Sequence, residues 1–200
     1  LINKAKKPFI VWGQGVILGK AEEEFKNFVE KSGIPAAWTI LGLSALPTSH
    51  ELNVGMVGMH GNYGPNILTN KCDLLIAIGM RFDDRVTGDP STYASQAKII
   101  HLEIDPAEVD KNIKVDVPVI GNCKESLKMI TDKIDKRSHK KWISKFDDLM
   151  KIEFDKVIKS DLSANKKGLT MGESIIAIND YTKGDAIIVT DVGQHQMVAC

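Results

Sequence analysis

Residues 73–79, DLLIAIG, form a nearly uniform apolar run that ends in glycine. Such runs are typical of strands that are buried on both faces of a parallel sheet, whereas a half-exposed strand alternates between apolar and polar residues. Similar runs occur as PFIVWG at 8–13, IPAAWTI at 34–40, KIIHLEI at 98–104 and VDVPVIG at 115–121. The sequence therefore predicts a parallel sheet that is covered on both sides.

Three helices are predicted between these strands, where apolar residues recur at helical spacing. They are expected at residues 21–33, 65–72 and 124–134. Residues 41–64 are punctuated by glycine and proline, which favours loops there. Because strands and helices alternate, we expect one doubly wound α/β domain over residues 1–135.

The composition changes after this domain. Residues 136–168 are charge-rich and carry apolar residues at helical spacing, so a connecting helix and a linker are expected there. A second unit is expected at 169–200, in which Thr170 begins a helix and AIIVTD at 186–191 forms a strand. We expect this unit to be truncated, because one helix and one strand cannot close a core. The chain also begins with Leu, which favours a piece of a longer protein.

The charge balance is neutral, with 26 basic and 26 acidic side chains. Neither nucleic acid nor anionic lipid is therefore expected as a partner. No apolar run reaches the roughly 18–20 residues of a membrane span, and no signal peptide is recognisable. Cys72, Cys123 and Cys200 form no CxxC pair, which favours a reducing compartment without a zinc site. We expect a cytoplasmic protein.

The first candidate site is GQGVILG at 13–19, directly after the first strand. Gly13 and Gly15 permit positive φ and let a diphosphate approach the backbone, and a helix expected to begin near Gly19 adds its positive end. The spacing is GxGxxxG, whereas the dinucleotide fingerprint is GxGxxG, so the motif alone is weak. A nucleotide contact and an ordinary strand-to-helix turn both stay open.

The second candidate is the glycine-rich stretch GMVGMHGNYG at 55–64. A loop without bulky side chains can lie flat against a planar or extended ligand, and Met59 adds a soft apolar wall beside His60. The alternative is a flexible surface turn with a hydrogen-bonded histidine.

The third candidate is GMRFDDRVTGDP at 79–90, at the carboxyl end of a strand, where open α/β sheets bind ligands. Arg81 can bind a phosphate there through two N–H groups, while Asp83 and Asp84 orient the arginines or accept from ligand hydroxyls. A catalytic dyad is disfavoured, because adjacent residues of an extended loop point to different sides. A nucleotide clamp is favoured over a salt-bridged loop, and both are favoured over a metal site.

Two further strand ends carry polar residues. Glu103, in HLEIDP at 101–106, can accept from ribose hydroxyls, and a solvated carboxylate is the alternative. In DVGQHQM at 191–197, residues 194–196 offer amide and imidazole donors. A turn that contacts a diphosphate is favoured over a catalytic triad, since no nucleophile is visible beside His195.

Taken in order, several of these stretches closely resemble the large catalytic subunit of acetolactate synthase, also called acetohydroxyacid synthase. They are GQG, TIL at 39–41, GMVGMHG, CDLLIAIGMRFDDRVTG, IIHLEIDPAEVDKN and VGQHQM. The resemblance implies that residues 1–135 are the central FAD-binding domain of a thiamine-diphosphate enzyme, with a six-stranded, Rossmann-like parallel sheet. It implies that residues 169–200 begin the domain that binds thiamine diphosphate.

The residues that match the family's cofactor contacts lie mostly after the strands. For FAD the resemblance implies contacts from Gly13, Gln14, Gly15, Thr39, Ile40, Leu41, Met59, His60, Gly79, Arg81, Asp83, Arg85, Val86, Glu103, Ile104 and Asn122, and from Gln196 and Met197 of the second unit. For thiamine diphosphate it implies contacts from Val192, Gly193, Gln194 and His195. The family usually has Asp where Asn122 stands, which weakens the case for that contact. Asp84 and Arg85 also match the mouth of the family's substrate channel.

The resemblance also implies an activity for the intact protein. The family condenses pyruvate with pyruvate or 2-oxobutyrate, with decarboxylation, in branched-chain amino-acid biosynthesis, and uses thiamine diphosphate, Mg²⁺ and a mainly structural FAD. Its catalytic glutamate and its Mg²⁺ motif match no residue here, so no catalytic residue and no metal ligand are assigned and these residues alone are expected to be inactive. A homodimer or homotetramer, a regulatory subunit and an organellar location in plants or fungi are further expectations.

Two alternatives stay open. Glyoxylate carboligase is another FAD-containing thiamine-diphosphate enzyme, although the spelling of RFDDRVTG and GMHG favours acetolactate synthase. The second alternative is a non-catalytic nucleotide-binding module, since a chain with cofactor contacts and no catalytic residue can bind FAD without turnover.

Overall fold

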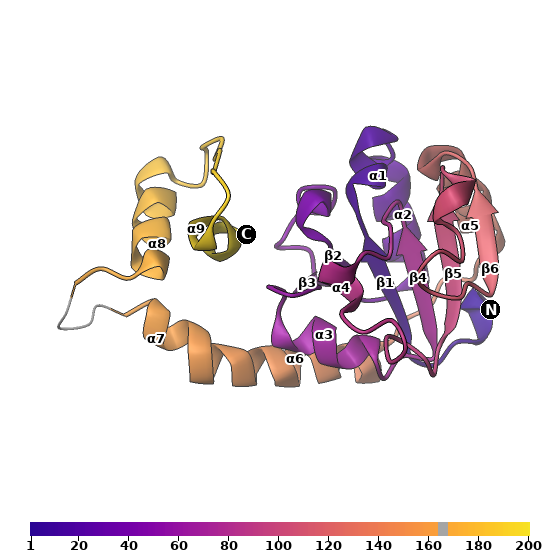
Figure 1. The fold of residues 1–200 in the computed structure, drawn as a ribbon, viewed down its shortest axis with the longest axis horizontal. Helices are drawn as coiled ribbons and strands as arrows, with labels where there is room; N and C mark the ends of the chain where they lie inside the picture. The colour runs from indigo at the N-terminus through magenta and orange to yellow at the C-terminus, as the bar shows by residue number, and fades with distance from the viewer. Residues whose placement is uncertain (164–167) are drawn as a thin grey trace. The chain divides into compact units, whose positions relative to one another are not determined.

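The computed structural model of the chain describes residues 1–163 and 168–200, which form two compact units, Leu1–Leu149 and Met150–Cys200. The linker predicted at 136–168 falls partly on residues 164–167, which lie outside the described residues. The sheet belongs to the first unit, and its strands lie side by side in Figure 1.

Six parallel strands form this sheet in the order β3-β2-β1-β4-β5-β6. The strands are β1 (Pro8–Trp12), β2 (Ala36–Trp38), β3 (Asn53–Met56), β4 (Leu74–Ile78), β5 (Lys98–Glu103) and β6 (Val117–Ile120). Every residue of β1, β2 and β4 is buried, as expected from their uniformly apolar runs. The predicted fold class, a doubly wound α/β domain with a six-stranded parallel sheet, is confirmed.

The apolar pattern did not predict strand β3, because Asn53 and Gly55 are poor strand formers. It is a short edge strand that pairs with β2. Burial of Val54 and Met56 accounts for its place in the sheet. The interpretation of residues 41–64 as loop is therefore wrong for this segment.

Helices cover both faces of the sheet. In the first unit they are η1 (Ile2–Lys4), α1 (Gln14–Leu18), α2 (Glu22–Ser32), η2 (Ile40–Gly42), α3 (Tyr63–Thr69), α4 (Asp84–Thr87), η3 (Pro106–Glu108), α5 (Cys123–Lys133) and most of α6 (Lys140–Glu153). Trp12 of β1 contacts Phe25 of α2 with ring centroids 5.0 Å apart, and Phe9 contacts Phe146 of α6 at 5.2 Å. Because Phe9 and Trp12 point to opposite faces of one strand, α2 and α6 lie on opposite sides of the sheet.

Helix α2 illustrates how the sequence encodes these elements. Phe25, Phe28 and Val29 are spaced for one helical face, and all three are buried. Gly33 ends the helix in the left-handed conformation at φ 62°, and a Cβ there would collide with the carbonyl oxygen of Arg137. The helix and its glycine stop are both as predicted.

The described part of the second unit is mainly helical. It contains the end of α6, the π-helical turn η4 (Phe154–Ile158), α7 (Lys159–Asp161), α8 (Met171–Thr182) and α9 (Gln194–Ala199). Thr170 caps α8 and forms a capping box with Glu173, which confirms the predicted helix start. Within residues 1–163 and 168–200, no helix has the length and apolar character to cross a membrane.

The strand predicted at 186–191 is wrong, because this segment is neither helix nor strand. Ile187 and Val189 are almost completely exposed. An apolar run forms a stable strand when another strand pairs with it, and the described part of this unit contains no strand to do so.

Candidate functional site

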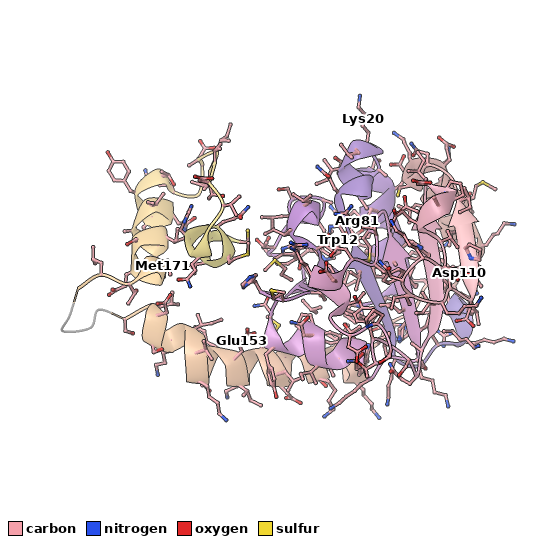
Figure 2. The ribbon with its side chains drawn as sticks, in the orientation of Figure 1. Trp12, Lys20, Arg81, Asp110, Glu153 and Met171 are labelled. Atoms are coloured by element: carbon pink, nitrogen blue, oxygen red, sulfur yellow. The ribbon has the colours of Figure 1, made fainter. Side chains whose placement is uncertain are left out.

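The carboxyl ends of the strands form the candidate site. All six strands are parallel, so the loops that follow them lie along one edge of the sheet. The chain runs from β1 outward to β2 and β3, and then returns to β4 on the other side of β1. Open α/β sheets bind ligands at such a switch point, here the space above β1 and β4. Figure 2 marks Trp12 and Arg81 at this edge.

The turns after β1 and β4 are in direct backbone contact. The N–H of Gly15 donates to the carbonyl oxygen of Gly79 at 2.8 Å. A Cβ on Gly13 would lie 2.6 Å from that oxygen, and one on Gly15 would lie 2.6 Å from Cα of Gly79. Glycine is therefore required at both positions, because the two turns approach so closely.

Neither Gly13 nor Gly15 adopts the positive φ that a glycine permits. Gly13 has φ −129°, and the residue with positive φ at this contact is Gly79, at 57°. The helix expected near Gly19 is α2, which begins at Glu22, and the short helix α1 before it, which starts at Gln14, was not predicted. The side chain of Gln14 is exposed at the edge.

The turn after β2 lies beside the turn after β1. The N–H of Thr39 donates to the carbonyl oxygen of Trp12 at 2.8 Å, and a Cβ on Gly42 would lie 3.0 Å from Cα of Gly13. Between them, Ile40 is half-buried and Leu41 exposes 60 % of its surface. The TIL and GQG stretches, which are far apart in the sequence, are thus neighbours in the fold.

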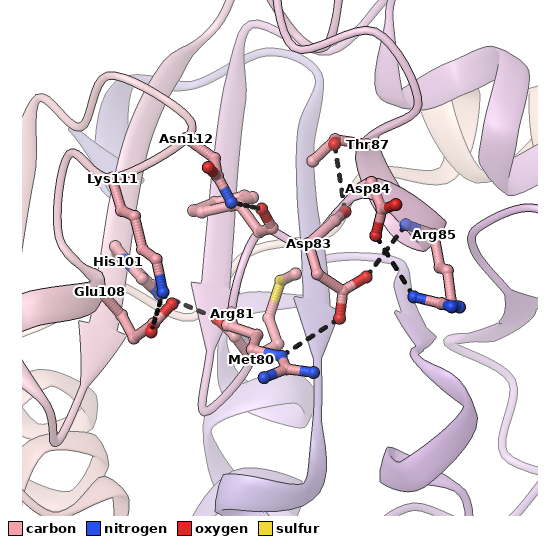
Figure 3. Close-up of polar contacts among 11 residues, drawn as sticks. Met80, Arg81, Asp83, Asp84, Arg85, Thr87, His101, Glu108, Lys111 and Asn112 are labelled. Carbon is pink, nitrogen blue, oxygen red and sulfur yellow. Dashed lines mark hydrogen bonds and ion pairs between the residues drawn. The ribbon is translucent and has the colours of Figure 1, made fainter.

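Asp83 orders the arginine loop after β4 (Figure 3). One of its carboxylate oxygens accepts from Nε of Arg81 at 3.2 Å, and the other accepts from the backbone N–H of Arg85 at 3.1 Å. Asp83 is thereby the N-cap of α4, in which Val86 is half-buried. Asp84 contacts Nη1 of Arg85 at 3.4 Å. Both aspartates thus bond to the arginines, which is one of the two roles considered from the sequence.

Both guanidinium groups face solvent, with 69 % of the Arg81 side chain and 79 % of the Arg85 side chain exposed. Exposed ion pairs of this kind contribute little to stability. Among the described residues, Asp83 bonds the Arg81 guanidinium through Nε, which leaves Nη1 and Nη2 available to a ligand. The same residues contain no group of three or more His, Cys, Asp or Glu side chains that could hold a metal ion.

The glycine-rich loop after β3 is held against the arginine loop. The N–H of Met59 donates to the carbonyl oxygen of Arg85 at 2.7 Å. Gly58 exchanges two hydrogen bonds with the side chain of Asn66, at 2.9 and 2.8 Å. The side chains of Met59 and His60 are exposed. The loop is therefore anchored by its backbone while its side chains face outward.

The ends of β5 and β6 complete the edge. Glu103 is buried, and one of its oxygens accepts from the backbone N–H groups of Ile104 and Asp105 at 2.8 and 3.2 Å. The solvated carboxylate considered from the sequence does not describe it, because Glu103 is buried, whereas a role as ribose acceptor through its other oxygen stays a prediction. Ile104 is exposed, and Asn122 caps α5 by accepting from the N–H of Lys124 at 2.8 Å.

One thiol lies beside this acid. Burial, and next the Glu103 carboxylate, raise the pKa of Cys123 to about 11. The thiol is therefore protonated at neutral pH.

Two polar residues at this edge were not singled out as site residues from the sequence. Nε2 of the buried His101 lies 2.8 Å from the carbonyl oxygen of Met80, and Nδ2 of Asn112 donates to that of Phe82 at 2.7 Å. A histidine inside the apolar run KIIHLEI is a signal that could have found the first. Asn112 carries no comparable signal, since its partner is a distant backbone group.

The predicted thiamine-diphosphate contacts lie in the second unit, at the start of α9. Gly193 is the N-cap of α9, and a Cβ there would lie 2.9 Å from the ring of His195. Val192 is exposed, and its N–H is bonded to Asp191 at 2.7 Å. Gln194, Gln196 and Met197 are in the helix itself.

A hollow of about 600 Å³ lies elsewhere in the first unit. Its lining includes Glu30, Gly33, His50 and Leu52. Because β2 and β3 begin just after Gly33 and Leu52, this hollow is at the amino ends of the strands. It is therefore distinct from the edge at which the predicted contacts gather.

Comparison with known proteins agrees with this arrangement. Residues 1–130 match the family model described as "Thiamine pyrophosphate enzyme, central domain". The acetolactate synthase large subunit of Lactococcus lactis is 39 % identical over 198 residues, which cover 98 % of this chain and 33 % of that protein.

Further relatives come from other lineages. The large subunit of Corynebacterium glutamicum is 41 % identical and covers 100 % of this chain and 32 % of that protein. Acetolactate synthase 3, chloroplastic, of Brassica napus is 39 % identical and covers 100 % of this chain and 30 % of that protein. The chain spans about a third of the length of these relatives, and the predicted resemblance is confirmed. The chain belongs to the family of thiamine pyrophosphate enzyme central domains.

Proposed function

We propose that the carboxyl edge of the sheet binds FAD, with the diphosphate at Arg81. The observation that carries the proposal is the exposed Arg81 guanidinium beside the β1–β4 switch point, bonded by Asp83 at Nε and available at its Nη groups. Guanidinium groups bind phosphate oxygens through paired N–H donors, and a charge-assisted pair of this kind is strong.

The surroundings of Arg81 fit the rest of such a ligand. Leu41, Met59 and Ile104 are apolar side chains that are largely exposed along the same edge. Exposed apolar groups next to cationic ones suit a ligand that joins flat rings to a diphosphate. The remaining edge residues implied by the resemblance, including Gln14, His60, Val86, Glu103 and Asn122, are proposed as further contacts.

We propose that the whole protein is an acetolactate synthase. It would condense pyruvate with pyruvate or 2-oxobutyrate, with decarboxylation, using thiamine diphosphate and Mg²⁺. Thiamine diphosphate supplies the decarboxylation and carbon–carbon bond chemistry when it is bound. In this account Val192, Gly193, Gln194 and His195 contact that cofactor, and Gln196 and Met197 approach the flavin. No catalytic residue and no Mg²⁺ ligand are assigned to this chain.

The domain assignment is part of the same proposal. Residues 1–135 would be the FAD-binding domain, 136–168 the connection and 169–200 the start of the domain for thiamine diphosphate. The proposed assembly is a homodimer or homotetramer with a regulatory subunit as a further partner. The proposed location is the cytoplasm, or an organelle if the source is a plant or fungus.

The test uses the protein at its full natural length. One sample of the purified protein is denatured, and the released cofactor is identified by its absorption and fluorescence spectra. A native sample is assayed with pyruvate and with glyoxylate. We expect FAD and turnover of pyruvate. Turnover of glyoxylate alone would assign the protein to glyoxylate carboligase, and bound FAD without turnover of either acid would favour a binding module.

A further inference from the structure

The backbone on both sides of Arg81 is held by side chains from elsewhere in the fold (Figure 3). The carbonyl oxygen of Met80 lies 2.8 Å from Nε2 of His101, on β5. The carbonyl oxygen of Phe82 accepts from Nδ2 of Asn112 at 2.7 Å, from the loop between β5 and β6. These carbonyls belong to the residues directly before and after Arg81, and we call the pair of bonds the carbonyl clamp.

His101 is a rigid half of the clamp. Its side chain is fully buried, and its ring lies 4.9 Å from the ring of Phe82. A carbonyl oxygen can only accept, so Nε2 carries the proton. Nδ1 is buried without a partner among the described residues, so the bond to Met80 is the hydrogen bond that holds the ring. Glu103 lies 3.7 Å from Nε2, too far for a hydrogen bond.

Asn112 is delivered by an ordered loop. Asp110 accepts from the N–H of Val115 at 2.7 Å and closes the turn that carries Asn112. This bond lowers the pKa of the Asp110 carboxyl, as expected for a carboxylate that accepts from a backbone N–H. The neighbours Ile113 and Val115 are buried and tie the loop to the core. The amide of Asn112 thus reaches Phe82 from a fixed position.

We propose that His101 and Asn112 are positioning residues for Arg81, and that they act by fixing its backbone so that the guanidinium faces the diphosphate of a dinucleotide. A free arginine side chain loses considerable rotamer freedom when it binds a ligand. Here the carbonyl clamp fixes the backbone and Asp83 restrains Nε before any ligand arrives. Such preorganisation lowers the ordering cost of binding.

This inference rests on the proposed function, and a double-mutant cycle separates the two. FAD affinity is measured by flavin fluorescence on the protein at its full natural length, after removal of FAD, for Asn112→Ala, Arg81→Ala and the double variant. We expect Asn112→Ala to weaken binding about 2- to 10-fold, the range for loss of one neutral hydrogen bond. In the Arg81→Ala background the same substitution should have no further effect, because the clamp acts through Arg81.

A second pair of variants tests the other half of the clamp. His101→Gln keeps an N–H donor at about the reach of Nε2, so it should retain most of the affinity for FAD. His101→Leu has no such donor, so its affinity should fall by the same factor as that of Asn112→Ala. Asn27→Ala, which removes an exposed asparagine on α2, is the control and should change nothing. Circular dichroism checks that each variant is folded. NMR relaxation of the Arg81 ¹⁵Nε signal in the FAD-free protein should show greater mobility of this side chain in Asn112→Ala than in the wild type. This measurement does not depend on whether His101→Leu folds.

The outcomes are distinct. If Arg81→Ala weakens binding but Asn112→Ala has no effect, or has an equal effect in both backgrounds, the positioning role is overturned and the proposed function stands. If Arg81→Ala leaves the affinity unchanged, the proposed contact and this inference are both overturned.

Discussion

The peptide units of Gly15 and Gly79 are in contact, with the N–H of Gly15 bonded to the carbonyl oxygen of Gly79 at 2.8 Å. This contact joins the turn after β1 to the turn after β4, the two turns that flank the switch point of the sheet. It therefore sets the position from which the chain continues to Arg81.

Gly79→Ala should destabilise the protein. A Cβ there would lie 2.7 Å from Cα of Gly15 and 2.9 Å from N of Val16, so backbone must move. We expect the free energy of unfolding to fall by about 1–3 kcal/mol from overpacking, in addition to the strain of a positive φ. Urea denaturation measures the change.

Gly88→Ala is the comparison for this substitution. Gly88 has φ 60° and ψ −121°, a backbone conformation that favours glycine, but a Cβ there meets nothing within 4 Å. It should show the strain of the backbone without the overpacking. An unchanged stability in Gly79→Ala would show that the contact between the two turns is not tight.

Asp83 should affect both the fold and the ligand. Asp83→Ala removes the N-cap of α4 and the partner of Arg81, so we expect about 1 kcal/mol lower stability and weaker FAD binding. Asp83→Asn keeps a good N-cap but removes the charge that faces Arg81, so it should retain the stability and lose part of the affinity. Denaturation and FAD titration measure the two effects.

Asp84→Ala is the comparison for these variants. Asp84 is exposed and contacts the exposed Arg85 at 3.4 Å, a pair worth little in water. Stability should therefore be nearly unchanged. A loss as large as that of Asp83→Ala would contradict the roles given to the two aspartates.

Asp116 should contribute to the free energy of unfolding at neutral pH and lose this contribution at acid pH. Its carboxylate accepts from Nζ of Lys98 at 2.7 Å and from the N–H of Ile99 at 2.9 Å, and these bonds lower its pKa. A carboxyl whose pKa is lower in the folded state contributes stability above its unfolded pKa of about 3.9, and this contribution disappears as pH falls through the folded value. Asp116→Asn should therefore be less stable at neutral pH and lose less stability below about pH 4.

Urea denaturation at neutral and acid pH measures this difference. Lys98→Met serves as the partner variant, because it removes one of the two bonds and leaves the carboxylate in place. Its acid sensitivity should lie between those of the wild type and Asp116→Asn. Parallel pH profiles for the wild type and Asp116→Asn would exclude Asp116 as a source of the acid sensitivity.

The apolar pattern predicted most of the sheet, because strands that are buried on both faces are apolar at most positions. It missed β3, whose Asn53 and Gly55 are tolerated at a sheet edge, and it wrongly predicted a strand at 186–191. A local pattern does not report whether a neighbouring strand exists. It therefore does not distinguish a paired apolar segment from an exposed one.

The site was predicted residue by residue only where a side chain stands in a recognisable motif. The spacing of Gly13 and Gly15 indicated that the backbone requires glycine there. It did not reveal the reason, which is the close contact with Gly79 and not a positive φ. His101 and Asn112 act on carbonyl groups of residues 21 and 30 positions away in the chain. Such partners become visible when the fold brings them together.

The affinity of FAD for Arg81→Ala, in the protein at its full natural length, tests the central claim most directly. Loss of a charge-assisted contact to phosphate should weaken binding by about 1.5–3 kcal/mol, on the order of 10- to 100-fold. Lys141→Ala, which removes an exposed cation from α6, is the control and should leave the affinity unchanged. An Arg81→Ala protein that is folded and binds FAD as tightly as the wild type would contradict the account.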